Sequence, residues 1–227
     1  MSENPSMCAD RKAAPEILGK VMVLGLGTTG RAVCDYLLTQ QERLESFCVY
    51  AGASSEDARA FAVTLEAAGA QVFFDTIEVT GNFDLCIASP GISQFSDFYQ
   101  NALAHAKEVV SEVEFAWRES AADSTWITIT GTNGKTTTTA LCAHLLQAQG
   151  WRAQAVGNIG DTCIEAVSKG ETDYFVAEIS SYQLASTKDL APDVAVLLNI
   201  TPDHLKWHGS FEEYCATKQR IYANLAR

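Results

Sequence analysis

Short apolar stretches alternate with longer segments of helical periodicity through the first half of the chain. The apolar, strand-like stretches cover residues 21–24, 47–50, 72–74, 84–89 and 109–110. Between them lie segments with helix signals, among them serine-led starts at 54–57 and 111–114; the second has the spacing of a capping box. Strands that alternate with helices predict a parallel α/β sheet.

The same alternation resumes after a short polar stretch at 121–124, which we interpret as a linker. Further strands are predicted at 126–130, 153–156, 174–178 and 194–199, and a final helix at 210–225. In the first half, a helix is also predicted after the break at 89–91, ending near residue 106. Residues 1–18 read as a loosely attached lead. We therefore predict an α/β protein with a Rossmann-like domain over 1–122 and a second α/β domain over 123–227.

Composition narrows the classes of partner. The chain has 227 residues, 47% of them hydrophobic, and 28 acidic against 16 basic side chains give a net charge of −12. This excess of acid argues against a nucleic-acid partner, which requires a basic surface. The sequence shows neither a signal peptide nor a bilayer-spanning stretch, and its seven cysteines lack C-x-x-C spacing. We expect a cytoplasmic protein with reduced thiols that does not engage a membrane.

A phosphate-binding loop is the most specific motif. It follows the strand at 126–130 and precedes a helical pattern, and its residues are Gly131, Thr132, Asn133, Gly134, Lys135, Thr136 and Thr137. Backbone N–H groups of such a loop cradle a nucleotide triphosphate, the lysine reaches the outer phosphates, and the following hydroxyl binds Mg²⁺. Ile129 stands where the general pattern has its first glycine, so the loop is a variant that points to a P-loop domain of a particular family.

Two weaker motifs lie in the first domain. The glycines at 25, 27 and 30 follow a strand and form either a dinucleotide-type loop or a tight turn that binds nothing. The second strand ends without an acid at residues 49–53, which argues against NAD. Ser89, Pro90 and Gly91 end a later strand at the edge where α/β sheets bind ligands, although a simple strand terminator is the favoured local reading.

Three further features of the second domain suggest metal or ligand chemistry. Glu178 ends a strand and is a candidate Mg²⁺ ligand or an ordinary exposed acid. Residues 199–204 place an amide, a carboxylate and the imidazole of His204 after another strand. Lys218 falls within an apolar helical stripe, so it either snorkels to water or is a partly buried amine with a lowered pKa, able to form a carbamate with CO₂.

Taken together, these motifs resemble the Mur ligases of peptidoglycan synthesis, and most closely the members that add D-glutamate. The matching stretches are residues 25–30, 89–92, 131–137, 157–160, 178–184, 199–204 and Lys218. The loop at 130–136 is shared with folylpolyglutamate ligases. The stretches at 157–160 and 180–184 narrow the resemblance to the D-glutamate-adding branch.

The resemblance implies a reaction and a set of roles. It implies ATP and Mg²⁺ as cofactors, and UDP-N-acetylmuramoyl-L-alanine and D-glutamate as substrates that are joined through an acyl phosphate. Lys135, His204 and a carbamylated Lys218 would be catalytic, and Thr136, Glu178, His204 and Lys218 would be metal ligands. The UDP substrate would contact Gly27, Thr28, Thr29, Ser89, Pro90, Gly91, Asn158, Ser180 and Gln183.

The chain departs from this family in two details and in length. Lys206 and Trp207 stand where the family pattern has an aspartate and an arginine, and the second strand lacks its usual acidic end. The resemblance stops partway through the ATPase domain, so we expect a truncated, inactive chain whose exposed sheet edge self-associates. The alternatives are a module that binds the UDP substrate without catalysis, and an unrelated P-loop NTPase or kinase.

Overall fold

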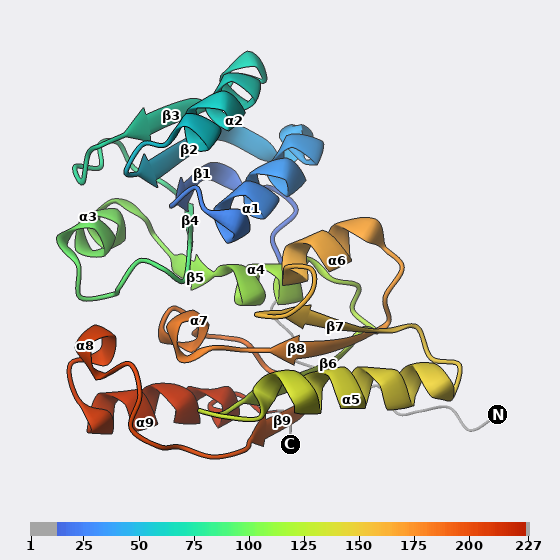
Figure 1. Cartoon of the computed structure of the whole chain (residues 1–227). Helices are drawn as coiled ribbons and strands as arrows, with labels where there is room; N and C mark the ends of the chain where they lie inside the picture. Colours follow the sequence, from blue (N-terminus) through green and yellow to red (C-terminus); the bar gives the residue numbers. More distant parts are fainter. Residues whose placement is uncertain (1–12, 226–227) are drawn as a thin grey trace.

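Two parallel sheets with helices on their faces make up the protein, as the alternating pattern predicts. The computed structural model describes residues 13–225. The first sheet has the strand order β3-β2-β1-β4-β5 and the second the order β7-β8-β6-β9. Figure 1 shows the first sheet above the second, with helix α4 and helix α6 between them.

The strands of the first sheet lie between residues 19 and 111, and the helices packed on it extend to residue 119. Its strands are β1 (Gly19–Leu24), β2 (Leu44–Gly52), β3 (Gln71–Phe74), β4 (Leu85–Ala88) and β5 (Val109–Ser111). Its helices are α1 (Thr28–Thr39), α2 (Glu56–Ala67), α3 (Asp97–His105) and α4 (Glu112–Glu119), with a 3₁₀ turn η1 (Gln41–Arg43). Apolar side chains are buried on both faces, because helices or connecting segments cover each of them.

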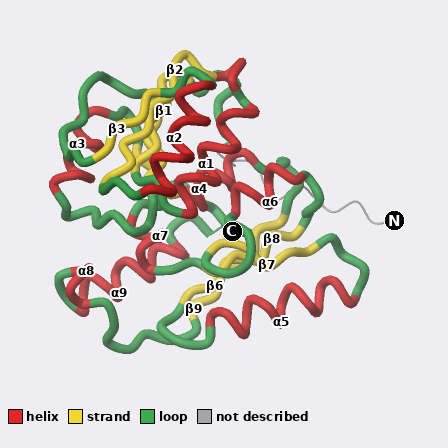
Figure 2. The backbone as a smooth tube through the Cα atoms, turned by 45° about the horizontal axis from the view of Figure 1, so that its top comes forward, coloured by secondary structure: helices red, strands yellow, loops and turns green. Residues whose placement is uncertain are grey.

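The second sheet begins at Thr125. Its strands are β6 (Thr125–Thr130), β7 (Ala153–Gly157), β8 (Tyr174–Glu178) and β9 (Val194–Leu197). Its helices are α5 (Lys135–Ala148), α6 (Cys163–Lys169), α7 (Ser181–Ala185), α8 (Leu205–His208) and α9 (Phe211–Gln219), and a 3₁₀ turn η2 (Arg220–Tyr222) follows. In Figure 2 helix α5 runs along one side of this sheet, opposite α6.

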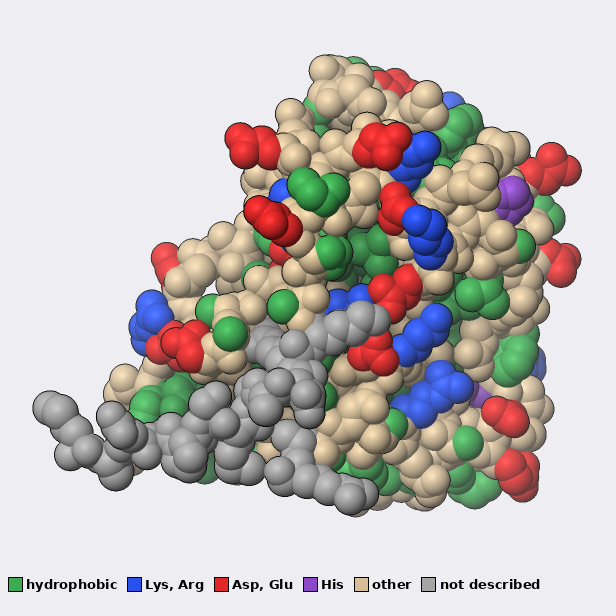
Figure 3. Space-filling view, turned by 180° about the vertical axis from the view of Figure 1, so that it is seen from behind, with side chains coloured by type: hydrophobic (Ala, Val, Ile, Leu, Met, Phe, Trp, Pro, Cys, Tyr) green, Lys and Arg blue, Asp and Glu red, His purple; other side chains and the backbone are tan. Residues whose placement is uncertain are grey.

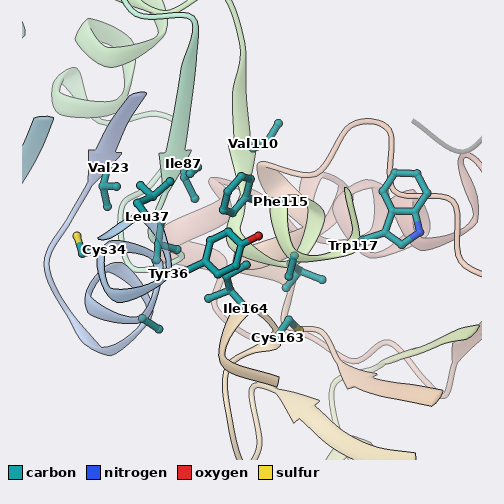
Figure 4. Packing of buried hydrophobic residues seen from close by; sticks show 14 of the residues in the cluster. Val23, Cys34, Tyr36, Leu37, Ile87, Val110, Phe115, Trp117, Cys163 and Ile164 are labelled. Atoms are coloured by element: carbon teal, nitrogen blue, oxygen red, sulfur yellow. The ribbon is translucent and has the colours of Figure 1, made fainter. Parts of the chain in front are cut away.

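One continuous apolar cluster joins the two sheets. It extends from β1 and α1 through α4 to α6 and β8. In Figure 4 the rings of Tyr36 and Phe115 face each other beside Ile164 and Cys163, and the two ring centroids lie 5.8 Å apart in an edge-to-face arrangement. The packing at this junction is therefore that of an interior, where lost methylene groups are costly.

Helix α4 adds polar contacts to the same junction. Glu112 accepts a hydrogen bond from the N–H of Ile164 at 2.7 Å, at the start of α6. Glu114 accepts hydrogen bonds from the N–H groups of Lys188 and Asp189, and it pairs with Arg118. Carboxylates of α4 thus accept hydrogen bonds from backbone groups at the start of α6 and in the loop after α7.

Only one of the two hydrogen bonds of the predicted capping box at 111–114 is present. The Ser111 hydroxyl accepts a hydrogen bond from the N–H of Glu114 as expected. The Glu114 carboxylate does not return to Ser111, because it bonds to the loop after α7, and the Ser111 N–H donates instead to the Ser186 carbonyl at 2.9 Å.

Other sequence predictions need correction at element ends. The lead is not loose over its described part: Leu18 is buried and Ala14 bonds to Arg118, while residues 1–12 lie outside the described chain. Helix α3 starts at Asp97 rather than near 92, because Ser96 caps it. The last helix ends at Gln219, where the chain tightens into η2.

In the described residues, no helix combines the length and the apolar character that crossing a bilayer demands. Acidic and basic side chains are interspersed over the face drawn in Figure 3. The six cysteines at 34, 48, 86, 142, 163 and 215 are free thiols; the seventh, Cys8, lies outside the described part.

Candidate functional site

The carboxyl ends of β6 and β8 meet at a polar cavity of about 230 Å³ in the second sheet. Its lining brings together Gly131, Thr132, Lys135, Asn158, Ser180, Ser181, Tyr182, Asp203, His204, Tyr214 and Lys218. Seven of the predicted site residues therefore share one cavity although they lie up to 87 positions apart. Open α/β sheets bind ligands at this edge.

The phosphate loop lies between β6 and the start of α5, as predicted. Gly134 has a φ of 83° and forms the N-cap of α5, a left-handed conformation that favours glycine. The Lys135 ammonium donates to the Thr132 carbonyl at 2.9 Å, so it lies folded back over the loop. Thr136 and Thr137 occupy the exposed first turn of α5. Unpaired N–H groups of that turn and the helix dipole favour a bound anion.

Glu178 is buried rather than an exposed strand-end acid, because its side chain is only 1% exposed. One carboxylate oxygen, Oε1, accepts a hydrogen bond from the Asn158 amide at 2.8 Å. The other, Oε2, is buried with no hydrogen-bond partner in the described structure. A buried carboxylate oxygen without a partner is costly, and a hard cation would satisfy it.

The turn at Gly157 explains how Asn158 reaches Glu178. Gly157 has a φ of 95°, and a Cβ there would lie 2.6 Å from the Glu178 carbonyl oxygen. The backbone of the turn can therefore rest directly on the end of β8 only when this residue is glycine. The Asn158 N–H then donates to the Glu178 carbonyl at 3.0 Å.

Lys218 points inward, so the snorkelling interpretation is wrong. The side chain is 2% exposed, and its ammonium donates to the Gly131 carbonyl at 2.8 Å. It also lies 4.9 Å from the centroid of the Tyr214 ring. Burial and the nearby positive charge of Lys135 lower the pKa of Lys218 to about 8, against an opposing effect of Asp203. The amine is therefore easier to deprotonate than an exposed lysine.

His204 is the N-cap of α8 and has a φ of 51°, a left-handed conformation that is uncommon outside glycine. Its ring lies 4.9 Å from the Tyr182 ring, and it pairs with Asp203 at 3.4 Å. The next imidazole, His208, is buried, and burial lowers its pKa to about 4. Its Nε2 lies 2.9 Å from the Ser181 hydroxyl, so the neutral ring braces the start of α7.

Three predicted site features behave differently from a simple ligand contact. The Gln183 side chain, 5% exposed, accepts hydrogen bonds from the N–H and hydroxyl of Ser180 and completes a capping box at α7. The amide of Asn199, expected to face a ligand, is bonded to the backbone of Asn133. Among the described residues, no three His, Cys, Asp or Glu side chains form a metal-binding group.

The glycine loop of the first domain serves two purposes at its different positions. A Cβ at Gly30 would lie 1.9 Å from the Gly25 carbonyl oxygen, and one at Gly25 would lie 2.9 Å from Ser89. Both are required for close packing of β1, α1 and the end of β4. A Cβ at Gly27 would have no heavy atom within 4 Å, and its φ of −74° suits any residue. Packing therefore does not require a glycine at 27.

The remaining predicted substrate residues follow β1 and β4, at the same end of the first sheet as Gly27. Gly27, Thr28 and Thr29 begin α1 at the end of β1. Ser89, Pro90 and Gly91 follow β4, which pairs with β1, and the Ser89 hydroxyl donates to the Gly25 carbonyl at 3.3 Å. None of these six lines the cavity of the second sheet. The predicted residues thus fall into two groups, one at the end of each sheet.

Sequence reasoning missed one side chain that lines the cavity, Tyr214. Asp203 belongs to the stretch 199–204 that was expected at this edge, and Ser181 and Tyr182 lie in a polar stretch that suits ligand contact or helix capping equally. Tyr214 was read as part of the apolar stripe of its helix, and it is indeed 1% exposed. A tyrosine beside a buried lysine was the available signal, because a buried hydroxyl requires a partner.

Comparison with known proteins gives one family. The model of the Mur ligase middle domain matches residues 129–227. A UDP-N-acetylmuramoylalanine–D-glutamate ligase of Corynebacterium diphtheriae is 37% identical over 92% of this chain and 44% of its own length. A ligase of the same name from Geobacter metallireducens is 40% identical over 92% of this chain and 46% of its own length. The chain thus spans a little under half of these curated relatives.

The fold agrees with these relatives. The crystal structure of UDP-N-acetylmuramate:L-alanyl-gamma-D-glutamyl-meso-diaminopimelate ligase from Neisseria meningitidis aligns with 92% of this chain and 68% of its own. The TM-score is 0.52 at 15% identity, so this likeness concerns the fold alone. With its two parallel sheets, its variant phosphate loop and relatives of this identity, the chain belongs to the Mur ligase family.

Proposed function

We propose that this chain carries the UDP-substrate and ATP-phosphate sites of an ATP-dependent ligase that joins D-glutamate to UDP-N-acetylmuramoyl-L-alanine. The single observation that carries the proposal is the cavity in which Lys135, Lys218, His204 and Asn158 meet. The names of the relatives supply the substrates. The proposed division at 122/123 follows the change from the first sheet to the second.

The reaction would run in two steps. A carboxylate oxygen of the muramoyl-alanine attacks the γ-phosphorus of ATP, and ADP leaves. The nitrogen of D-glutamate then attacks the acyl carbon, phosphate leaves and the nitrogen loses a proton. Phosphoryl transfer depends on positioning and on neutralising charge. Lys135 and the N–H groups at the start of α5 would hold the outer phosphates, and Asn158 and Ser180 would orient the carboxylate.

One carboxylate oxygen without a hydrogen-bond partner supports a Mg²⁺ site in this cavity. Glu178 presents a buried Oε2 without a partner, the hard oxygen that Mg²⁺ prefers. We propose Thr136, Glu178, His204 and a carbamylated Lys218 as metal ligands. Bound Mg²⁺ supplies charge neutralisation on the phosphates. A neutral amine of Lys218 attacks CO₂ and loses a proton, which replaces a cation with an oxygen anion.

The UDP part would bind across Gly27, Thr28, Thr29, Ser89, Pro90 and Gly91 at the end of the first sheet. The open space over Gly27 supports this, because glycine there serves no packing need. A cytoplasmic site suits the free thiols and the nucleotide substrates, and we propose it on those grounds.

The test is selective loss of two ligands. Gly27→Val places a side chain in open space, so it should leave the melting temperature unchanged and lower the affinity for UDP-N-acetylmuramoyl-L-alanine at least tenfold. Lys135→Ala should lower the affinity for Mg²⁺–ATP at least tenfold and leave the affinity for the UDP substrate unchanged. Ala67→Val, on the exposed side of α2, is the control for Gly27→Val. Calorimetric titration measures both constants.

Each outcome bears on one reading. Loss of UDP-substrate affinity in Gly27→Val with intact ATP binding supports the ligase assignment. Binding of the UDP substrate without any ATP binding by the wild type would favour a binding module. ATP binding without any UDP-substrate binding would favour an unrelated P-loop NTPase and overturn the proposal.

A further inference from the structure

We propose that Asn199 and Tyr214 are positioning residues that fix the phosphate loop in the shape that receives phosphates. Neither side chain needs to touch the nucleotide for this role. The inference rests on the proposed function only in taking the phosphates of ATP as the ligand of the loop.

Asn199 grips the backbone of the loop at two points. Its Oδ1 accepts a hydrogen bond from the Asn133 N–H at 3.0 Å, and its Nδ2 donates to the Asn133 carbonyl at 3.0 Å. Its own carbonyl accepts from the Thr132 N–H, also at 3.0 Å. Asn199, which follows β9, therefore makes three hydrogen bonds to the backbone of Thr132 and Asn133, much as a neighbouring strand would.

Tyr214 grips the loop from the other side, through Thr132. Its hydroxyl lies 2.9 Å from the Thr132 hydroxyl, which also accepts from the Thr201 N–H at 3.0 Å. The ring is 1% exposed and lies against the Lys218 ammonium, so the hydroxyl is delivered by a fixed ring. A tyrosine held this way loses little conformational freedom when its hydroxyl bonds.

These contacts settle which N–H groups remain for an anion. The Asn133 N–H is already used by Asn199, so it cannot serve a phosphate without breaking that bond. The Thr138 N–H begins the regular pattern of α5 by donating to Gly134. Of the N–H groups of residues 132–138, those of residues 134–137 are left in the described structure, at the first turn of a helix, where anions bind.

A loop with two glycines would otherwise be costly to order. Fixing the backbone of a residue costs conformational entropy, and glycine loses the most. If the contacts of Asn199 and Tyr214 order the loop in the free protein, this cost does not fall on nucleotide binding. The two residues would then contribute to affinity without touching the ligand.

The first experiment measures amide hydrogen exchange in the ligand-free chain. Asn199→Ala and Tyr214→Phe should speed exchange in the loop peptide around 129–137 and leave the strands of the first sheet unchanged. The matched controls are Asn101→Ala, which removes an amide bonded to the Ile77 carbonyl in the first domain, and Tyr174→Phe at the opposite end of β8. A purely structural role would instead speed exchange throughout the second sheet and lower the melting temperature.

The second experiment measures nucleotide affinity by calorimetry. Each variant should lower the affinity for ATP and for ADP by roughly threefold to tenfold, the effect of losing one or two hydrogen bonds. The affinity for AMP, which lacks the outer phosphates, and for the UDP substrate should stay unchanged. In Tyr214→Phe combined with Thr132→Ala the two losses should not add, because both remove the same contact.

Unchanged exchange of the loop in both variants would overturn the inference, even if the wild type binds ATP as proposed. Faster exchange in a chain whose wild type binds no ATP would support the positioning role and contradict the proposed function. Equal weakening of AMP and ATP would also overturn the inference, because it would show a general loss of structure.

Discussion

The two sheets of this protein differ in how completely they are covered. The first buries apolar side chains on both faces, with Val23 and Ile87 on one face and Met22 and Cys86 on the other at most 1% exposed. The second shares the junction cluster on one face, whereas the described cluster on its other face has three buried apolar residues, Ile129 and Val176 on the strands and Ala143 on α5. The less completely covered sheet holds the polar cavity. Apolar burial is thus more extensive in the half that does not contain this cavity.

The difference shows in single side chains. Leu37 on α1 is 0% exposed, whereas Leu141 and Leu145 on α5 are 55% and 57% exposed. Buried polar atoms without a hydrogen-bond partner are more frequent in the second half: among the described residues Thr139, Glu178, Trp207 and His208 each have one, against the Arg118 Nε on α4 in the first half. Burying a polar atom without a hydrogen bond is unfavourable, and such atoms are typical of functional sites.

Core truncation gives the largest expected contrast. Leu37→Ala removes a fully buried side chain and should cost about 2–5 kcal/mol of unfolding free energy. Leu145→Ala, the same substitution on the exposed face of α5, should cost less than about 1 kcal/mol. Urea denaturation measures both. Equal losses would contradict the contrast between the sheets.

The junction between the sheets should respond to pH through Glu112. Burial raises the pKa of Glu112 to about 7, against the hydrogen bond from Ile164 and with a further rise from Glu165. Because this folded pKa lies above the ordinary 4.5, the stabilising contribution is complete below about pH 4.5 and is lost as the pH rises through about 7.

Glu112→Gln tests this pH dependence, because glutamine keeps an acceptor for Ile164 but cannot ionise. Relative to the wild type, the variant should gain up to roughly 3 kcal/mol of unfolding free energy between pH 5 and pH 8. Glu66→Gln, on exposed α2, is the control. The account of the junction fails if the stability difference between Glu112→Gln and the wild type stays constant over this range.

The outer edge of β9 gives the smallest expected effect. In the described structure β9 pairs only with β6, and Val194 on it is 45% exposed. Unpaired edges recruit other strands, so we expect weak, concentration-dependent self-association that Val194→Lys reduces. Light scattering across concentration measures it, and a monomer at every concentration would remove this consequence of the incomplete covering.

The division into two α/β sheets could be predicted from the sequence, because strands can be recognised from their local composition. The strand at 174–178 and the phosphate loop were placed correctly from their own residues. The pairing of Asn158 with Glu178 was not, since it depends on how a glycine turn meets a strand 20 positions later. The roles of Asn199 and Tyr214 were missed for the same reason: their partners lie 66 and 82 positions away.

The most direct test of the account is calorimetric titration of UDP-N-acetylmuramoyl-L-alanine into the chain, first alone and then with Mg²⁺ and a non-hydrolysable ATP analogue at saturation. The account predicts that the UDP substrate binds in both cases, because the end of the first sheet and the cavity of the second hold different parts of a ternary complex. No binding of the UDP substrate, or displacement of one ligand by the other, would contradict it.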